Sequence, residues 1–328
     1  MLSRVANSLF WLGRYVERAE NYARFIDVNL NLSLDLPPDL IEQWDPLISA
    51  TGDREFFQEL YGDKFNRENA IKFLAFDNKN QNSIITTIQK ARENARIVRE
   101  NIPRETWEVL NELHFYLQEK HKLKVWKKEE SGSIFKDIKN QLQLLNGISY
   151  GTIPRTLGWY FTRLGHYLER ADKTSRILDV KYHFLLPSVE DVGSPLDFLH
   201  WTALLKSVSG FNAYRRMFGK IDPASIVQYL VLNRYFPRSI FFCLIEAERC
   251  LHEISQEPLG FSNLAEKAIG NLRADLEYAD VNDLFAFGLH EYLDQLQIRL
   301  NQISTAVDDQ YFKIQSNFSA EFQKQSQP

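Results

Sequence analysis

The chain contains one long motif twice, and this repetition limits its fold more than any other feature. WLGRYVERAENYARFIDV covers residues 11–28, and TRLGHYLERADKTSRILDV covers residues 162–180. A second block, FDNKNQNSIITTIQKARE at residues 76–93, matches LNRYFPRSIFFCLIEAER at residues 232–249. The first pair is offset by 152 positions and the second by 156. Ordered matches at a nearly constant offset predict two tandem copies of one unit of roughly 150 residues.

The two copies are expected to cover residues 1–150 and 151–328 and to pack as one domain. Each copy opens with a helical pattern, because apolar residues recur at spacings of three and four and define one buried stripe. In the first copy these are Leu12, Val16, Ala19, Ala23, Ile26 and Leu30. Breakers such as Gly62, Pro103, the segment 147–151 and Gly219 separate the helices, and no alternating strand pattern lies between them. The sequence predicts an all-α helical bundle of two tandem copies.

Composition narrows the class of partner. A formal net charge of −4 argues against a dominant partnership with nucleic acid or anionic lipid. There is no apolar run of about 18 residues, so no membrane span is expected. The two cysteines, Cys243 and Cys250, are seven residues apart on one helical face, too distant for a disulfide. We expect them to fill the core of a reduced, cytoplasmic protein.

The opening helices carry a charged stripe beside the apolar one. Four residues of the first copy share this face, and four of the second repeat it: Glu17, Glu20, Arg24 and Asp27, then Glu169, Asp172, Arg176 and Asp179. Spacing favours pairs within each helix: Glu20 with Arg24, Asp172 with Arg176, Arg14 with Glu17, and Glu169 with Lys173.

Arg18 and Arg170 differ from the other arginines of the stripe. Each follows its glutamate by one residue, about 100° around the helix, and cannot pair with that neighbour. If the two opening helices meet, the arginine of one copy would contact a carboxylate of the other. The sequence therefore predicts a buried charge network between the copies, whose disruption would cost several kcal/mol.

Three interpretations of this stripe remain open. In the first, the stripe is purely structural, either a solvated face or an inter-copy salt-bridge cluster. In the second, it binds an anionic or peptide-like ligand through arginine clamps. The third interpretation is metal-assisted or acid/base catalysis, because paired carboxylates offer oxygen ligands. A di-iron bundle needs Glu-x-x-His on facing helices, whereas this chain has His166-x-x-Glu169 with Arg14 at the equivalent place. No metal or cofactor is predicted, and no glycine-rich phosphate loop is present.

Four segments together carry a family resemblance. They are MLSRVANSLFWLGRYVERAENYARFIDV, GWYFTRLGHYLERAD, FPRSIFFCLIEAER, and ARENARIVRE with the following Trp107, Glu108 and Asn111. The chain resembles the bacterial alpha-E family, a helical domain of unknown function named for its Glu-Arg motif. The resemblance covers essentially the whole chain. One position departs from the family pattern, because His166 stands where an arginine is usual, and this would make a site there pH-dependent or inactive.

The resemblance implies partners. Members are typically encoded beside a circularly permuted ATP-grasp protein and a transglutaminase-like protein, in a system proposed to make or attach small peptides by amide ligation. We therefore expect a helical accessory or binding subunit of such a system, with a peptide ligand. An enzyme that uses the carboxylate and arginine stripe, and a purely structural scaffold, are the alternatives. The candidate binding residues are Arg14, Glu17, Arg18, Glu20, Arg24, His166, Glu169, Arg170, Asp172, Arg176, Arg92, Glu93 and Arg96.

Overall fold

The computed structural model describes residues 1–35, 44–128, 132–184, 194–257 and 260–313. Within these ranges the chain forms fifteen α-helices joined by short 3₁₀ and π segments, and it has no β-strand. The predicted all-α class is confirmed. Among the described residues, no helix has the length and apolar character needed to cross a bilayer.

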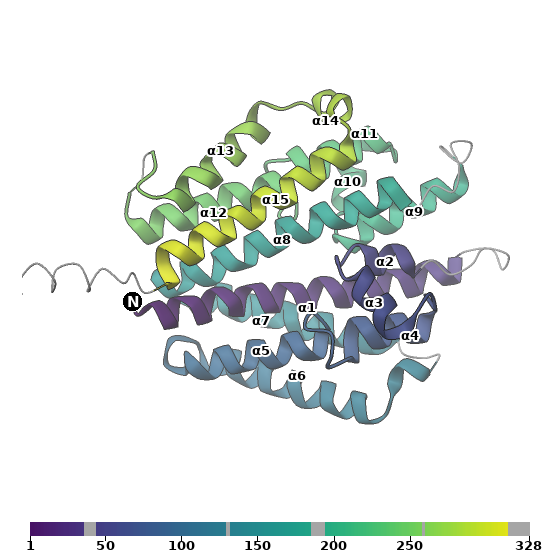
Figure 1. Cartoon of the computed structure of the whole chain (residues 1–328), viewed down its shortest axis with the longest axis horizontal. Helices are drawn as coiled ribbons and strands as arrows, with labels where there is room; N and C mark the ends of the chain where they lie inside the picture. Colours follow the sequence, from purple (N-terminus) through teal and green to yellow (C-terminus); the bar gives the residue numbers. More distant parts are fainter. Residues whose placement is uncertain (36–43, 129–131, 185–193, 258–259, 314–328) are drawn as a thin grey trace, which may run out of the picture.

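Two long helices form the centre of the molecule. Helix α1 (Ser3–Asp35) and helix α8 (Leu157–Phe184) run side by side in the same direction (Figure 1). Their backbones touch at two glycines: a methyl group at Gly13 would overlap the carbonyl oxygen of Thr162, and one at Gly165 would overlap that of Phe10. Gly13 corresponds to Gly165, and Phe10 to Thr162, in the repeat, so the two contacts are reciprocal.

After its long helix, each half continues in the same order with three short or medium helices, a π-helix and a longer helix. Among the described residues, the first half then adds two helices and two 3₁₀ segments, and the second adds three helices and a π-helix. After α1 come α2 (Asp45–Ser49), α3 (Arg54–Tyr61), α4 (Arg67–Ile71), the π-helix η1 (Lys72–Phe76), α5 (Ile84–Ile97), η2 (Arg99–Asn101), α6 (Arg104–Lys122), η3 (Val125–Lys127) and α7 (Gly132–Thr152). After α8 come α9 (Pro195–Ser207), α10 (Phe211–Phe218), α11 (Pro223–Val227), the π-helix η5 (Gln228–Leu232), α12 (Ile240–Ser255), α13 (Leu264–Tyr278), α14 (Val281–Phe287), α15 (Leu289–Val307) and the π-helix η6 (Asp308–Phe312).

Corresponding helices begin with corresponding caps. Asn66 accepts a hydrogen bond at the start of α4 and Asp222 does so at the start of α11. Ser83 caps α5 and Ser239 caps α12 in the same way. Such caps supply an acceptor to a free backbone N–H of the first turn and fix where the helix starts. Both pairs are 156 positions apart, the offset of the second repeated block.

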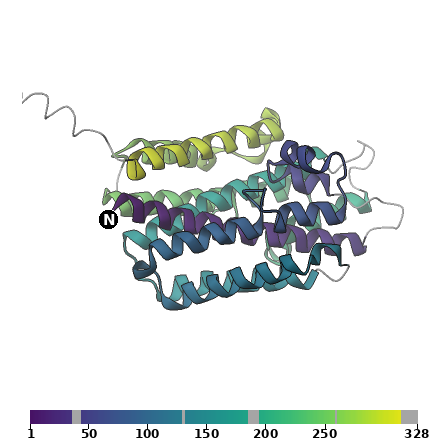
Figure 2. The ribbon, with the colours of Figure 1, turned by 60° about the horizontal axis from the view of Figure 1, so that its bottom comes forward.

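The outer helices pack in matching positions around the central pair. In the first half α5 and α7 contact α1, and α6 covers α5 and α7; in the second half α12 and α15 contact α8, and α13 covers α12 and α15 (Figures 1 and 2). The segment 147–151, expected to break a helix, lies inside α7. No neighbouring atom lies within 4 Å of the added methyl position at Gly147 or Gly151, so both glycines fit an ordinary helix. The expected boundary after residue 150 therefore falls in the last turn of α7.

The apolar stripe lies in the core, as predicted. Leu12, Val16, Ala19, Ala23 and Ile26 are buried and Leu30 is partly buried. Cys243 and Cys250 are free and buried, and burial raises the pKa of each thiol to about 12. Both cysteines are therefore apolar core residues, in agreement with the prediction.

Candidate functional site

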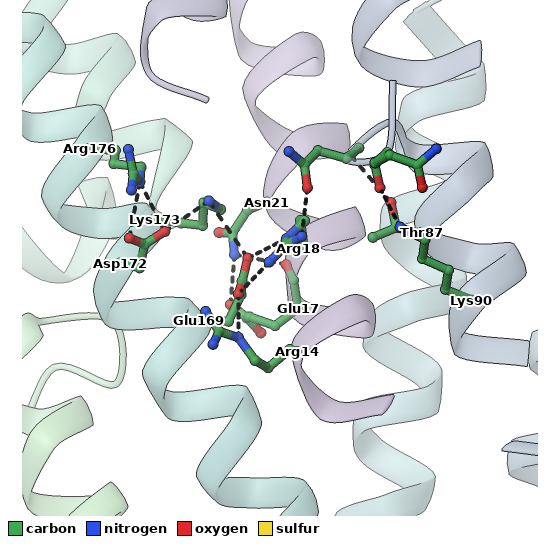
Figure 3. A network of polar contacts seen from close by, with 12 residues as sticks. Arg14, Glu17, Arg18, Asn21, Thr87, Lys90, Glu169, Asp172, Lys173 and Arg176 are labelled. Carbon is green, nitrogen blue, oxygen red and sulfur yellow. Dashed lines mark hydrogen bonds and ion pairs between the residues drawn. The ribbon is translucent and has the colours of Figure 1, made fainter. Parts of the chain in front are cut away.

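The parallel contact between α1 and α8 places Glu169 against two arginines of the other helix. Arg18 donates from Nε to Oε1 at 2.6 Å and from Nη2 to Oε2 at 3.0 Å. Arg14 donates from Nε to Oε2 at 2.8 Å, and Lys173 lies 3.7 Å from Oε1. Figure 3 shows both arginines extending from α1 to this carboxylate. The side chain of Glu169 has no exposed surface.

Glu17 has the reciprocal arrangement with a different set of donors. Arg170 donates to both of its oxygens at 2.9 Å. Arg238 donates to Oε1 at 2.7 Å, the Nδ1 atom of His166 lies 3.2 Å from Oε2, and Asn21 donates to Oε1 at 2.9 Å. The prediction that each arginine of the Glu-Arg motif meets the glutamate of the other copy is confirmed. The solvated-face interpretation is wrong, because Glu17 is as completely buried as Glu169.

A second tier of carboxylates extends this arrangement along both helices. Glu20 pairs with Arg24 on its own helix, and it accepts from Arg238 at 2.7 Å and from Asn146 of α7 at 2.9 Å. Asp172 accepts from Arg176 at 3.0 Å and from its neighbour Lys173 at 2.8 Å. We call the whole set the central network: Arg14, Glu17, Arg18, Glu20, Asn21, Arg24, Asn82, His166, Glu169, Arg170, Asp172, Lys173, Arg176 and Arg238.

Three of the four expected intrahelical pairs are present. Glu20 with Arg24 and Asp172 with Arg176 form as predicted, and Lys173 lies within ion-pair distance of Glu169. The expected pair of Arg14 with Glu17 is wrong. Arg14 instead joins Glu169 to the hydroxyl of Ser304 on α15, at 3.1 Å from Nη1. The close approach of the two helices at Gly13 brings Glu169 within reach, and the oxygens of Glu17 are already held by Arg170 and Arg238.

Two loops complete the network from outside the central helices. Each loop follows a π-helix and precedes a capped helix, and it delivers Asn82 in the first half and Arg238 in the second. Asn82 accepts from Arg18 at 2.7 Å. The second loop is held by Asn233, whose side chain accepts from the backbone N–H groups of Tyr235 and Phe236 at 2.8 Å. These turns fix the direction in which Arg238 points.

Charge outweighs burial at both central glutamates. Burial alone would raise the pKa of each carboxyl group, but the guanidinium groups reverse this effect. Arg170 and then Arg238 hold the pKa of Glu17 well below its ordinary value, and Arg18 and then Arg14 do the same for Glu169. Both glutamates are therefore ionised at neutral pH, and their oxygens are already occupied by hydrogen-bond donors.

His166 is the neutral member of the network. Burial, and then the charge of Arg170, hold the pKa of His166 well below its ordinary value, although Glu17 opposes the shift. An ionised carboxylate can only accept hydrogen bonds, so we assign the proton of the neutral ring to Nδ1, the nitrogen that lies 3.2 Å from Glu17. The other ring nitrogen, Nε2, is buried and has no hydrogen-bond partner among the described residues.

Three candidate residues lie apart from the network. They are Arg92, Glu93 and Arg96 on α5. Arg92 donates to Asn111 of α6 at 2.9 Å, and its guanidinium group lies over the Trp107 ring. Glu93 pairs with Arg96 at 2.7 Å. The resemblance grouped these residues with the Glu-Arg positions, but the structure gives them a separate contact between α5 and α6. The other ten candidates all belong to the central network.

Sequence reasoning missed two important members of the network, Asn82 and Arg238. Both stand immediately before the serine caps Ser83 and Ser239 in the second repeated block, so the alignment held a signal for them. The catalytic interpretation meets an obstacle here, because the oxygens of Glu17 and Glu169 are held by arginines. Within the described ranges, no cluster of three His, Cys, Asp or Glu side chains is arranged to hold a metal ion.

Comparisons with known proteins place the chain in a family. Uncharacterized proteins of Mycobacterium bovis and Mycobacterium tuberculosis are each 22% identical to it over 314 residues. The alignment covers 89% of this chain but 34% of each relative, so the chain spans about a third of their length. No solved structure matches the chain. The Alpha-E family model, described as a predicted alpha-helical domain with a conserved ER motif, matches residues 1–312, and the chain belongs to this family.

Proposed function

We propose that this chain is a non-catalytic helical binding subunit that works beside an ATP-grasp protein in peptide or amide ligation. The observation that carries the proposal is the closure of the central network. Glu17 and Glu169 are fully buried, ionised and bonded to arginines from the facing helix. A general base or a metal ligand needs a free oxygen and access to substrate, and these carboxylates have neither. Such a network instead fixes the geometry of a binding scaffold.

The mycobacterial relatives support a role beside other protein segments. In those proteins the matched region makes up about a third of the chain, so it lies in one polypeptide with further sequence. A helical unit that acts together with another protein fits either arrangement, with its partner in the same chain or in a separate one. The choice of an ATP-grasp protein as that partner comes from the family resemblance.

A polar hollow beside α1 is the proposed binding surface. It has a volume of about 570 Å³, and its side chains come from α1, the loop before α5, α5 and α6. Most of them are amides, which carry both a donor and an acceptor and match the hydrogen-bonding pattern of a peptide backbone. The lining is Tyr15, Asn78, Gln81, Thr86, Gln89, Lys90, Glu93, Asn94 and Gln118. Glu93, a candidate from the sequence, therefore lies at this surface.

The charge of the network favours an acidic group in the hollow. Seven basic side chains of the network face four carboxylates, and its one histidine is neutral: Arg14, Arg18, Arg24, Arg170, Lys173, Arg176 and Arg238 against Glu17, Glu20, Glu169 and Asp172. Arg18 and Lys90 both lie over the Tyr15 ring. The pKa of Lys90 is lowered by burial and then by Arg18. A carboxylate bound beside Lys90 would offset part of this positive excess.

Co-purification with a circularly permuted ATP-grasp protein from the same genome tests the proposal. We expect a stable complex, and ATP hydrolysis in the presence of a peptide acceptor that depends on this subunit. The double variant Gln89→Ala, Lys90→Ala should weaken the complex or its peptide affinity about tenfold, because it removes two polar contacts at the hollow.

A matched control uses the hollow in the second half. That hollow contains His252 and Glu253 on α12, the helix that corresponds to α5. The double variant His252→Ala, Glu253→Ala should leave binding unchanged. A lack of any complex, or equal effects of the two double variants, would contradict the proposal.

A further inference from the structure

A small cavity lies between α1, α6, α7 and α8, on the opposite edge of His166 from Glu17. Its free volume is about 30 Å³, enough for one or two water molecules or one small polar group. Its walls are mainly apolar and include Leu9, Leu12, Val16, Ile102, Leu145 and Ile153. The exposed side chain of Asn101 also lines it, so the cavity reaches towards the surface there.

Four residues that line this space each have a buried polar atom without a partner among the described residues. The atoms are Oγ1 of Thr106, Nε1 of Trp159, Nε of Arg163 and Nε2 of His166. Thr106, Trp159 and His166 are only 2%, 4% and 3% exposed, so solvent at the surface does not satisfy them. A buried polar atom without a hydrogen bond is costly, and such atoms are rarely left unsatisfied in folded proteins. Four of them around one cavity point to an occupant.

The cavity exists because a histidine replaces an arginine. In the first half, Arg14 extends past Glu169 and reaches Ser304 on α15. His166 is the counterpart of Arg14, and the counterpart of Ser304 is Ser149, since each serine lies three residues before the end of its helix. Ser149 lines the cavity, but the shorter imidazole does not reach across as the guanidinium does. The space that an arginine would fill therefore stays open.

We infer that this cavity binds the neutral hydroxyl or primary amide end of a small apolar molecule. The indole N–H of Trp159 and the Nε–H of Arg163 donate and need an acceptor, whereas Nε2 of the neutral His166 ring accepts and needs a donor. The hydroxyl of Thr106 serves either role. A hydroxyl or an amide supplies both a donor and an acceptor. A carboxylate has no proton for His166, and an ammonium group has no acceptor for Trp159.

This site is independent of the proposed partner and of the polar hollow, which lies against α5. The volume of about 30 Å³ admits one uncharged polar group with an apolar part no larger than about a methyl group, against the leucine and isoleucine walls. Occupancy would also affect the central network, because a donor to Nε2 favours the neutral ring whose Nδ1 faces Glu17.

Titration with acetamide and acetate, which have nearly the same shape, tests the inference. The readout is the indole N–H resonance of Trp159 in ¹⁵N-labelled full chain, assigned by its loss in Trp159→Phe. We expect acetamide to shift this resonance saturably and acetate to bind about tenfold more weakly, since it lacks the donor. Thr106→Val, which replaces the hydroxyl with a methyl group, should weaken acetamide binding about fivefold. Thr305→Val, at an exposed site on α15, should leave it unchanged.

Three results would overturn the inference. The first is the absence of a saturable shift with acetamide and with isopropanol, which would leave the cavity to ordered water alone. The second is equal binding of acetate and acetamide, which would contradict a neutral ligand. The third is a lower melting temperature of unliganded Thr106→Val, because removal of an unpaired hydroxyl from a vacant apolar site should raise it.

Discussion

Glu17 and Glu169 occupy corresponding positions on α1 and α8, yet their positive partners come from different places. Glu169 receives both of its guanidinium groups, Arg14 and Arg18, from the facing helix. Glu17 receives only Arg170 from the facing helix and takes its second guanidinium from Arg238 in the loop before α12.

The difference amounts to an exchange at two pairs of corresponding positions. Arg14 matches the neutral His166, and the neutral Asn82 matches Arg238. Each glutamate therefore has two guanidinium partners, although one of them has moved from helix to loop. The two sites thus have the same number of guanidinium partners and differ in the element that supplies one of them. The shorter side chain of His166 also accounts for the cavity beside it.

The largest expected effect comes from neutralising either glutamate. Glu17→Gln and Glu169→Gln should each lower the free energy of unfolding by about 3–5 kcal/mol, because each leaves buried guanidinium groups without their counter-charge. Glu169→Gln should be the more costly, since it leaves Arg14, Arg18 and Lys173 facing one another. Denaturant unfolding at pH 7 measures both values. A loss below about 1 kcal/mol in either variant would mean that the network is not tightly closed.

Alanine substitutions at the two contact glycines test whether both ends of the reciprocal α1–α8 contact contribute equally to stability. Gly13→Ala and Gly165→Ala should each cost about 3 kcal/mol, because the added methyl group meets backbone of the other helix and the helices must separate. Gly147→Ala on α7 is the control, where the methyl group has free space. It should stabilise the protein by about 0.5–1 kcal/mol. Thermal and denaturant unfolding of the three variants would show any inequality between Gly13 and Gly165.

Sequence patterns were sufficient to predict the helical class and the ion pairs between the two opening helices. The 3.6-residue periodicity located the buried stripe of α1, and the 100° separation of Arg18 from Glu17 showed that its partner lies on another element. The prediction that residues 147–151 interrupt a helix was wrong, because tertiary contacts of the helix can outweigh the low helix propensity of glycine.

Other features depend on three-dimensional packing and could not be read from spacing. Arg14 is within reach of Glu17 at i,i+3 and of Glu169 across the interface, and only the close approach at Gly13 selects the second. Arg238 enters from a loop whose direction is set by turns around Asn233. The cavity beside His166 needs four helices in place, so no local pattern in the sequence marks it.

A double-mutant cycle at positions 166 and 238 would measure whether the helix and the loop are interchangeable sources of the second guanidinium group. His166→Arg alone should destabilise the protein, because it adds a guanidinium beside Arg170 and Arg238. Arg238→Asn alone should also destabilise it, because Glu17 and Glu20 both lose a donor. The double variant reproduces the pattern of Arg14 and Asn82, so its loss should be about 1–2 kcal/mol smaller than the sum of the single losses. If the losses in free energy of unfolding, measured with denaturant, were strictly additive, the two positions would not exchange a guanidinium group in the way described above.

The smallest expected effect is a pH dependence that comes from the histidine of the central network. The folded state holds the pKa of His166 well below 6.5, so on acidification the unfolded chain takes up the proton first. Stability should therefore fall below pH 6.5, by up to about 1.4 kcal/mol per pH unit from this group. The groups facing the ring are Glu17, Arg163, Arg170 and Arg238.

His166→Asn should reduce this slope between about pH 6.5 and 5, above the range in which the carboxylates titrate. The remaining slope includes His114, whose pKa is also lowered, by burial and then by Arg92. His290→Asn is a control of opposite sign. Its hydrogen bond with Asp179 raises the pKa of His290, so that histidine stabilises the fold at low pH and loses this effect as pH rises. Unchanged slopes in His166→Asn would show that the ring is protonated in the folded state.

The reciprocal contact of α1 with α8 makes each half depend on the other for folding. Neither half carries its own complete set of counter-ions: each opening helix holds the acid that the other helix's base requires. A fragment cut after α7 would present an uncompensated charge cluster and a strip of bare backbone to water. Two such fragments mixed in solution should therefore fold only on association, and a solitary unit of this kind could exist only as a self-pairing dimer.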